Sequence, residues 1–260
     1  MIVEERGPAL VRRAAMEGEP LGGEALLGLE ARYGHFTAMQ VAGRRVRGLE
    51  LHLDRLEQAG KELFGAGPDR EVVLATIRAA LGDERDASVR VYEVEVDGRP
   101  RVIATTAPPH PPLPGPLRVR PVVYQRYLAH IKQASGFQQP HILRTVNRAG
   151  FDEALLTTED GLISEGAITN LGGFAGGRLI WPDAPKLHGI TMRLLERMDV
   201  PQEHRPLRVA DLAGFDLVFL CNSWGVMPVG EVDGTKLRLD AGPAEQVAAF
   251  YEGVPGDPVD

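Results

Sequence analysis

The chain has almost no cysteine. Cys221 is the only one in 260 residues, so no disulfide can form within the chain, which fits a reducing compartment. The opening residues, MIVEERGPAL, lack the basic and then apolar character of a signal peptide. No apolar run approaches the roughly 20 residues that span a bilayer. These absences predict a cytoplasmic protein without a membrane partner.

The chain also lacks long basic runs. Its formal net charge of −7 at pH 7 has the wrong sign for a general nucleic-acid binder, so we expect no nucleic-acid partner. A small ligand that carries a phosphate stays compatible with this charge, because a pocket needs only a few positive groups of its own.

Lysine is scarce as well. Arginine and lysine together number 29, yet the lysines are only Lys61, Lys132, Lys186 and Lys236. If the chemistry of this protein needs a lysine amine, only these four side chains have to be considered.

A proline-rich stretch, APPHPPLPGP at residues 107–116, marks the clearest boundary in the chain. Proline fixes φ and donates no backbone hydrogen bond, so the stretch is expected to be an extended spacer. It predicts a small α+β N-terminal lobe over residues 1–106, an interdomain connection over 107–123 and a larger C-terminal lobe over 124–260 that carries Lys132.

Apolar spacing and turn residues predict helices and strands on both sides of this boundary. Before it, residues 52–65 and 70–82 have helical spacing and end in glycine, and residues 88–106 resemble a β-hairpin around Asp97-Gly98. After it, the pattern predicts strands at 116–124, 151–157, 162–166 and 215–222 and helices at 140–150 and 189–198.

Three groups of residues suit one phosphorylated pyridine-aldehyde cofactor. Lys132 is flanked by apolar and small residues, and a desolvated, neutral amine can form a Schiff base with an aldehyde. Glu165 follows a strand-like run, where a carboxylate could keep a pyridine nitrogen protonated. A phosphate needs a helix start, hydroxyls and a cation, and the candidates are Gly189, Ile190, Thr191, Ser223 and Arg55. Considered alone, each of these residues has an ordinary alternative interpretation as a surface or loop residue.

The order of motifs resembles one family. AGFDEALLTTEDGLISEGAITNLGGF is similar to the central motif of the class IV aminotransferases, the fold-type IV pyridoxal-phosphate enzymes. YGHFTAMQV, HLDRL, LHGIT and VFLCNSWGVMPVGEVDG resemble further segments of that family, in the same order, from about residue 33 to residue 234. The resemblance implies a two-lobed α+β fold with a cofactor cleft between the lobes, pyridoxal 5′-phosphate as cofactor, no metal, and a homodimer.

The resemblance also implies roles for individual residues. Lys132 would form the internal aldimine and shuttle the α-proton, and Glu165 would bind the pyridine nitrogen. The remaining cofactor residues would hold or flank the phosphate: Arg55, Gly189, Ile190, Thr191, Asn222, Ser223 and Trp224. Candidates for the substrate are Tyr33, His35, Arg90 and Tyr92, on segments that face the cofactor cleft in relatives.

Several positions depart from the family pattern, and we expect them to affect the substrate rather than the cofactor. Gly172 stands where an aromatic residue is usual, Trp181-Pro182 replaces threonine-proline, and Met192 replaces a basic residue. Phe137 stands where branched-chain enzymes place a tyrosine, and it cannot donate a hydrogen bond. His35 and Ala38 stand where acidic residues are common.

The sequence predicts an aminotransferase that acts on a small amino donor and a keto-acid acceptor. One alternative is a lyase that releases pyruvate from an aminodeoxychorismate-like substrate. The segment VFLCNSWGVMPV resembles the corresponding segment of these lyases more than that of branched-chain enzymes. Another is a catalytically silent relative that acts as a binding protein. The sequence does not specify the donor, the acceptor or the preference for L- or D-amino acids.

Overall fold

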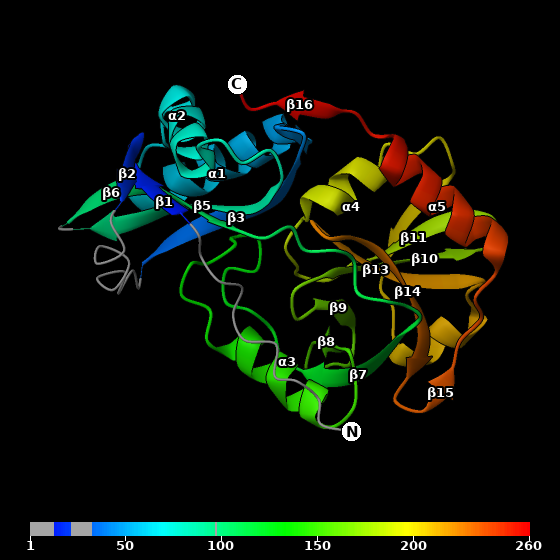
Figure 1. Cartoon of the computed structure of the whole chain (residues 1–260). Helices are drawn as coiled ribbons and strands as arrows, with labels where there is room; N and C mark the ends of the chain where they lie inside the picture. Colours follow the sequence, from blue (N-terminus) through cyan, green and yellow to red (C-terminus); the bar gives the residue numbers. More distant parts are fainter. Residues whose placement is uncertain (1–12, 22–32, 97) are drawn as a thin grey trace. The chain divides into compact units, whose positions relative to one another are not determined.

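The computed structural model describes residues 13–21, 33–96 and 98–260. The chain divides into two compact units (Figure 1). The first unit comprises the chain up to His110, together with Lys132–Ser135 and Pro255–Asp260. The second comprises Pro111–Ile131 and Gly136–Val254.

The first unit contains a seven-stranded antiparallel sheet. Its strands follow the order β16-β4-β3-β5-β6-β1-β2. The hairpin predicted for residues 88–106 is confirmed as β5 and β6, although its turn residue Asp97 lies outside the described residues. The strands are β1 (Arg13–Met16), β2 (Glu19–Leu21), β3 (Gly34–Ala42), β4 (Arg45–Arg47), β5 (Ala87–Val96), β6 (Arg99–Ala107) and β16 (Gly256–Pro258).

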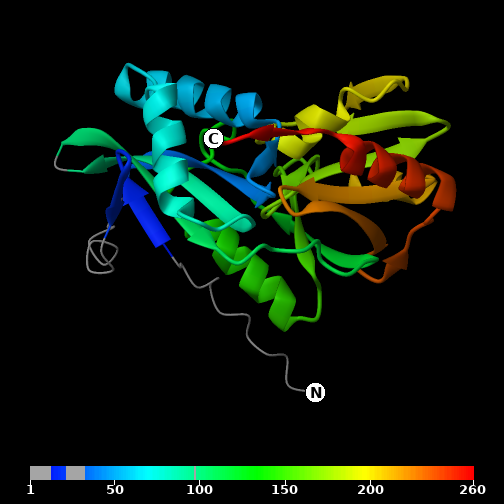
Figure 2. The ribbon, with the colours of Figure 1, turned by 45° about the horizontal axis from the view of Figure 1, so that its top comes forward.

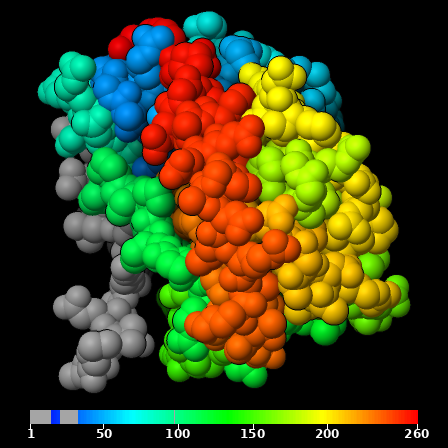
Figure 3. Space-filling model, turned by 90° about the vertical axis from the view of Figure 1, so that its right-hand side faces the viewer, coloured from blue at the N-terminus to red at the C-terminus, as the bar shows by residue number. Residues whose placement is uncertain are grey.

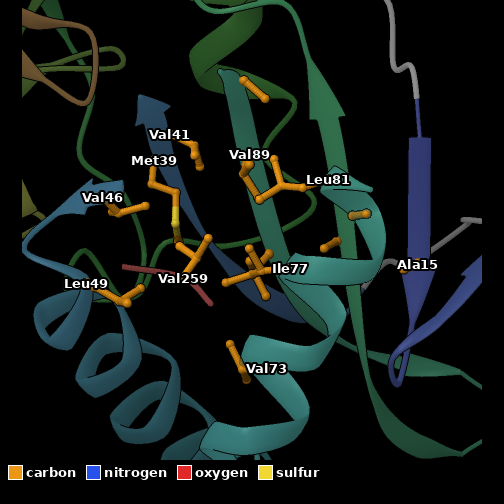
Figure 4. Close-up of a cluster of buried hydrophobic side chains, with 14 of the residues drawn as sticks. Ala15, Met39, Val41, Val46, Leu49, Val73, Ile77, Leu81, Val89 and Val259 are labelled. Carbon is orange, nitrogen blue, oxygen red and sulfur yellow. The ribbon is translucent and has the colours of Figure 1, made fainter. Parts of the chain in front are cut away.

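Two helices cover one face of this sheet (Figure 2). They are α1 (Leu49–Phe64) and α2 (Arg70–Leu81), both predicted from their apolar spacing. Met39 and Val41 of β3 pack with Ile77 of α2 in the core between sheet and helices (Figure 4). Gly65 ends α1 with φ at 83°, a left-handed conformation that glycine adopts without strain.

The C-terminal residues complete this unit. β16 pairs with β4, and Val259 is 1% exposed in the same apolar core (Figure 4). Asp257 accepts a hydrogen bond from the backbone N–H of Leu49 at the start of α1. The core of the first unit therefore combines residues from both ends of the described chain.

The second unit contains a nine-stranded mixed sheet. The order is β12-β11-β10-β13-β14-β7-β8-β9, and β15 pairs with β14. The pairs β11–β12, β14–β7 and β7–β8 are parallel, and the other pairs are antiparallel. The strands are β7 (Leu117–Val123), β8 (Glu153–Thr157), β9 (Ile163–Gly166), β10 (Asn170–Ala175), β11 (Arg178–Pro182), β12 (Gln202–Arg205), β13 (Leu217–Asn222), β14 (Gly225–Val232) and β15 (Thr235–Lys236).

The helices of the second unit are short. They are α3 (Gln138–Arg148), α4 (Ile190–Leu195), the 3-10 helix η2 (Val209–Gly214) and α5 (Ala241–Gly253). α5 lies at the surface beside α4, and Val247 packs with Met192 and Leu195 (Figure 3). The helix predicted for residues 189–198 is thus confirmed over its first part only.

The division of the chain differs from the predicted lobes in two places. Residues 117–123 were assigned to a connection, but the strand predicted at 116–124 is present there as β7, which lies between β14 and β8 inside the second sheet. Lys132 was assigned to the C-terminal lobe, but it belongs to the first unit because its segment pairs with β3. That pairing joins residues about a hundred positions apart, so the local sequence does not indicate it.

None of the helices in the described ranges combines the length and the apolar composition that crossing a bilayer requires.

Candidate active site

Lys132 is fixed to the first unit by backbone hydrogen bonds. The backbone N–H of Phe36 donates to the Lys132 carbonyl at 2.8 Å, and the N–H of Ala134 donates to the Gly34 carbonyl at 3.0 Å. His35 and Gln133 form an isolated antiparallel bridge between these two bonds. The lysine backbone is therefore held like a short extra strand beside the start of β3.

The amine of Lys132 lies on an aromatic platform. Its Nζ is 4.9 Å from the centre of the Phe36 ring, and that ring stacks on Tyr92 at 5.3 Å with 20° between the planes. Arg90 is opposite Ala38 in the strand register, two positions from Tyr92, so its side chain leaves the same face of the sheet. The structure thus brings together three predicted residues: Lys132, Arg90 and Tyr92.

His35 faces the other way. Its side chain is buried beside Phe64 of α1, and its Nε2 is 2.8 Å from Oε2 of Glu93, which is also buried. Neighbouring residues of a strand point to opposite faces, which separates His35 from Phe36. The prediction of His35 as a substrate residue is therefore corrected: it is a buried residue whose side chain contacts Glu93 within the first unit.

Two further predicted residues lie on the first unit. Tyr33 is half exposed, its hydroxyl donates to the Leu63 carbonyl at 3.4 Å, and its ring meets the edge of Phe64. Arg55 is half-buried on α1. The neighbouring acid of α1, Asp54, is paired with Arg70 at 2.6 Å.

Glu165 is the centre of the second group of predicted residues. It lies on β9, is 5% exposed, and its Oε1 accepts a hydrogen bond from Nε of the equally buried Arg126 at 2.9 Å. Its Oε2 accepts a hydrogen bond from the backbone N–H of Leu187 at 3.2 Å. A buried carboxylate needs an opposite charge and hydrogen bonds to remain ionised, and Glu165 has both. An ionised, buried carboxylate is the partner that a protonated pyridine nitrogen requires.

A second buried carboxyl group supports the turn that follows Glu165. Oε1 of Glu153 accepts hydrogen bonds from the backbone N–H groups of Ala154 at 2.9 Å and Ala167 at 3.2 Å. Burial raises the pKa of Glu153 to about 7. Gln139 of α3 holds the other side of the turn by donating to the Ala167 carbonyl at 2.8 Å.

The predicted phosphate residues Gly189, Ile190 and Thr191 begin α4. The N–H groups of a first helical turn have no acceptors within the helix, so they suit an anion. A Cβ at Gly189 would lie 1.9 Å from Oδ1 of Asn170, whose Nδ2 donates to the Leu187 carbonyl at 2.7 Å. Glycine is therefore required at this helix start, and Asn170 fixes the backbone that leads to it.

The other predicted phosphate residues form the turn between β13 and β14. Ser223 and Trp224 are its two central residues, and Oδ1 of Asn222 accepts a hydrogen bond from the backbone N–H of Trp224 at 2.8 Å. The hydroxyl of Thr191 donates to the Asn222 carbonyl at 2.6 Å. Nδ2 of Asn222 donates to the Ile168 carbonyl at 3.4 Å. The hairpin turn, the start of α4 and the turn after Glu165 are thus joined within the second unit.

Two departures from the family pattern explain each other. A Cβ at Gly172 would meet the Trp181 ring at 2.5 Å and the Phe219 ring at 2.6 Å, and these two rings pack edge to face. Trp181 therefore fills the space above a residue that has no side chain. Met192 is likewise 1% exposed in the same core cluster. The expectation that these positions affect the substrate is corrected: the side chains of Trp181 and Met192 are packed in the core, and the Trp181 ring covers Gly172.

Arg126 and Glu153 were not identified from the sequence. Arg126 is one arginine among many, and its only local signal is its position six residues before Lys132. Glu153 had a clearer signal, since it is an acidic residue at the start of the apolar run EALLT, all of which is buried.

Comparison with known families gives one assignment for most of the chain. Residues 34–232 match the family model described as Amino-transferase class IV. Over 113 residues the chain is 33% identical to a probable branched-chain-amino-acid aminotransferase of Aquifex aeolicus. That alignment covers 40% of this chain and 36% of the relative, so the chain matches well under half of that relative's length.

Solved structures resemble the whole fold. A hypothetical aminotransferase from Mycobacterium tuberculosis, in its PLP-bound form, has a TM-score of 0.78 at 21% identity and covers 93% of this chain and 98% of its own. A branched-chain amino acid aminotransferase from Escherichia coli has a TM-score of 0.79 at 17% identity, with 96% and 100% covered. These similarities confirm the predicted two-lobed α+β fold.

Proposed function

Because the chain belongs to the class IV aminotransferase family, whose members use pyridoxal 5′-phosphate, we propose that it transfers an amino group from an amino donor to a keto acid, with Lys132 as the residue that binds the cofactor. Membership of the family agrees with the enzyme class and cofactor predicted from the sequence. The roles of individual residues are our assignment.

One observation supports the proposal most directly. Glu165 is a buried carboxylate that Arg126 and the Leu187 N–H hold in place. The fold has no need of an ionised group there, since a buried ion pair seldom stabilises a protein more than apolar residues of the same size. A ligand with a protonated nitrogen would explain why an ionised carboxylate is buried at this position.

The chemistry is divided between the cofactor and the chain. Pyridoxal 5′-phosphate, when bound, supplies an aldehyde that reacts with amines and a ring that accepts electrons while its nitrogen is protonated. Lys132 would hold the cofactor through its Nζ, and the same amine, once the amino donor has displaced it, would accept the α-proton of the donor and return it. Glu165 would keep the ring nitrogen protonated. The proposed phosphate ligands are Arg55, the backbone of Gly189, Ile190 and Thr191, and Ser223, with Asn222 and Trp224 beside them.

The substrate carboxylate is assigned to the face of the first unit that carries Lys132. Arg90 offers a fork of donors that matches a carboxylate, and Tyr92 adds a hydroxyl. Tyr33 is a third candidate, as it is half exposed. Among the solved relatives, the Mycobacterium tuberculosis protein is also known in an alpha-ketoglutarate and PMP bound form, and we propose a keto acid of this kind as acceptor.

The first test is whether the protein takes up the cofactor on Lys132. We expect wild-type protein with pyridoxal 5′-phosphate to turn yellow, and borohydride followed by peptide mass spectrometry to find the pyridoxyl group on Lys132. Lys132→Ala should show neither signal. The matched control is Lys186→Ala, because burial lowers the pKa of Lys186 and so favours its neutral amine relative to an exposed lysine.

Two results would count against the proposal. If folded wild-type protein stays colourless, the result favours the alternative of a catalytically silent relative. If the label appears on Lys186, Lys132 is not the anchor.

A lyase is the second candidate, supported by the segment LCNSWGVMPV around the turn between β13 and β14. It uses the same lysine and cofactor, so only the reaction distinguishes the two. An aminotransferase consumes one keto acid for each amino group moved. A lyase releases pyruvate from an aminodeoxychorismate-like substrate with no acceptor present.

We also propose that the protein is a cytoplasmic homodimer. Six large apolar side chains in the described part of the chain are exposed, and three of them, Val123, Tyr127 and Phe137, fall between residues 123 and 137. Apolar groups gathered in one segment are typical of a surface that a partner covers. Sedimentation equilibrium should give twice the chain mass of 28.3 kDa. A monomer at micromolar concentration would contradict this.

A further inference from the structure

Arg126 makes more hydrogen bonds to the protein than a simple ion pair requires. Its Nε donates to Glu165, its Nη1 donates to the Ile131 carbonyl at 2.9 Å, and its Nη2 donates to the Ala129 carbonyl. The residue is 8% exposed. One buried guanidinium thus connects the Glu165 carboxylate to the backbone of the two residues at positions 129 and 131.

The carbonyls that Arg126 holds belong to the turn that ends directly before Lys132. Leu128 lies in this turn with φ at 49°, a left-handed conformation that is costly for a residue with a branched side chain. The backbone N–H of Ile131 donates to the Leu128 carbonyl at 2.9 Å. An unfavourable backbone conformation persists only where surrounding bonds maintain it, and Arg126 supplies two of them.

The shape of the guanidinium explains why arginine is needed here. It is planar, always charged, and presents five donors in fixed directions. A lysine could offer Glu165 a charge, but its compact ammonium cannot also reach two carbonyls in fixed directions. The neutral groups that could replace Arg126 would leave Glu165 buried without a counter-charge.

We infer that Arg126 is a positioning residue for the cofactor, in two ways at once. It keeps the Glu165 carboxylate ionised and oriented for the ring nitrogen, and it fixes the turn from which Lys132 emerges. The inference rests on the proposed function, because it assigns Arg126 a task only if Glu165 meets a pyridine nitrogen.

The first task can be measured by binding alone. Pyridoxal 5′-phosphate is compared with an analogue in which a C–H group replaces the ring nitrogen, using equilibrium dialysis. Wild-type protein should bind the natural cofactor about tenfold more tightly or better, as expected for one hydrogen bond between charged groups. In Arg126→Met this preference should shrink to less than about threefold, because the charge of Glu165 is no longer maintained.

The matched control is Arg118→Met. Arg118 lies in the same unit and also pairs with a glutamate, Glu231 at 3.4 Å, while donating to the Gly150 carbonyl at 2.9 Å. It should keep the wild-type preference for the natural cofactor.

The second task is measured by hydrogen exchange of cofactor-free protein. Amides in the peptide 127–131 should exchange faster in Arg126→Met than in wild type, and no faster in Arg118→Met. Arg126→Lys separates the two tasks and replaces Arg126→Met if that variant does not fold. It should keep most of the preference for the ring nitrogen while its turn exchanges as fast as in Arg126→Met.

The outcomes distinguish the inference from the function it rests on. If wild-type protein binds neither compound, the proposed function fails and the inference with it. If wild-type protein binds pyridoxal 5′-phosphate but Arg126→Met weakens both compounds by the same factor, Arg126 only supports the fold and the inference alone is overturned. Unchanged exchange of the turn in both Arg126 variants would overturn the second task.

Discussion

Glu153 is a carboxyl group enclosed by the backbone it supports. Its Oε1 accepts the N–H groups of Ala154 and Ala167, while Oε2 is buried and, within the described part of the chain, has no hydrogen-bond partner. The hydroxyl of Thr169 is in the same situation. Burial disfavours the charged form of the carboxyl and raises its pKa from 4.5 to about 7.

The raised pKa makes the stability of the protein depend on pH. Between pH 4.5 and 7 the folded state keeps the Glu153 proton while the unfolded state has lost it, so the contribution of this group falls as pH rises through that window. Glu153→Gln resembles the protonated form at every pH. Relative to this variant, wild-type protein should lose on the order of 3 kcal/mol in the free energy of unfolding between pH 4.5 and pH 8.

Urea unfolding at a series of pH values measures this difference. Glu159→Gln is the control, since Glu159 is an exposed carboxyl in the turn between β8 and β9 of the same hairpin. The difference in the free energy of unfolding between wild type and Glu153→Gln should change with pH, and the difference between wild type and Glu159→Gln should change less. A curve for Glu153→Gln that is as flat as the control curve would show that the buried carboxyl does not titrate in this range.

At the scale of elements, the paired strands β10 and β11 place a residue without a side chain next to a large aromatic ring. Gly172 has no side chain, and the fully buried ring of Trp181 on the paired strand occupies the space that a side chain there would need. Gly172→Ala should therefore destabilise the protein by about 1–3 kcal/mol, the usual cost of overfilling a packed core. In a Trp181→Phe background the same change should cost less, because part of the obstructing ring is gone.

Thermal or urea unfolding of the two single variants and the double variant completes the cycle. Gly214→Ala is the control, since a Cβ at Gly214 meets nothing within 4 Å and the change should have little effect. Equal costs of Gly172→Ala in both backgrounds would mean that the two positions are not coupled.

The elements that the sequence predicted correctly are those with local signals. α1 and α2 have an apolar face and a glycine at the end, and β5 and β6 surround a short turn. β10 was not predicted because NLGGFA resembles a turn, and its glycines make sense only beside the Trp181 ring. α4 ends at Leu195, earlier than predicted, and Gln202 binds the carbonyls of Glu196 and Met198 that follow it.

The candidate site likewise combines residues with a local sequence signal and residues that only tertiary contacts bring into place. Motifs predicted Lys132 and Glu165 as site residues, but the hydrogen bonds to them come from residues without a pattern, such as Arg126. His35 was misplaced because a strand alternates its faces, and the motif alone does not say which face meets the helices. Motifs indicated the candidates for the chemistry, whereas the residues that contact these candidates are set by the tertiary structure.

At the scale of the whole molecule, the chain passes from one unit to the other four times. Neither unit is a continuous fragment, and the first depends on Lys132–Ser135 and Pro255–Asp260. Val259→Ala should destabilise the protein by about 2 kcal/mol, since it removes two buried methyl groups from the core of the first unit. Removal of residues 255–260 should cost more, because β16 is lost as well.

Hydrogen exchange locates the effect of these changes. Peptides of β3 and β4 should lose protection in both variants, while peptides of β13 and β14 keep it. Val72→Ala is the matched control, because Val72 is 36% exposed on α2, lies outside the segment proposed as the dimer surface and should contribute little. Loss of protection spread evenly over both units would mean that they unfold together.

The place of Val259 in the first core also sets an order of events during synthesis. A ribosome makes α1, α2 and the strands they cover before it makes the second unit, whereas β16 and Val259 follow the second unit in the chain. The edge at β4 and the core of the first unit are therefore completed only after the whole second unit has been synthesised.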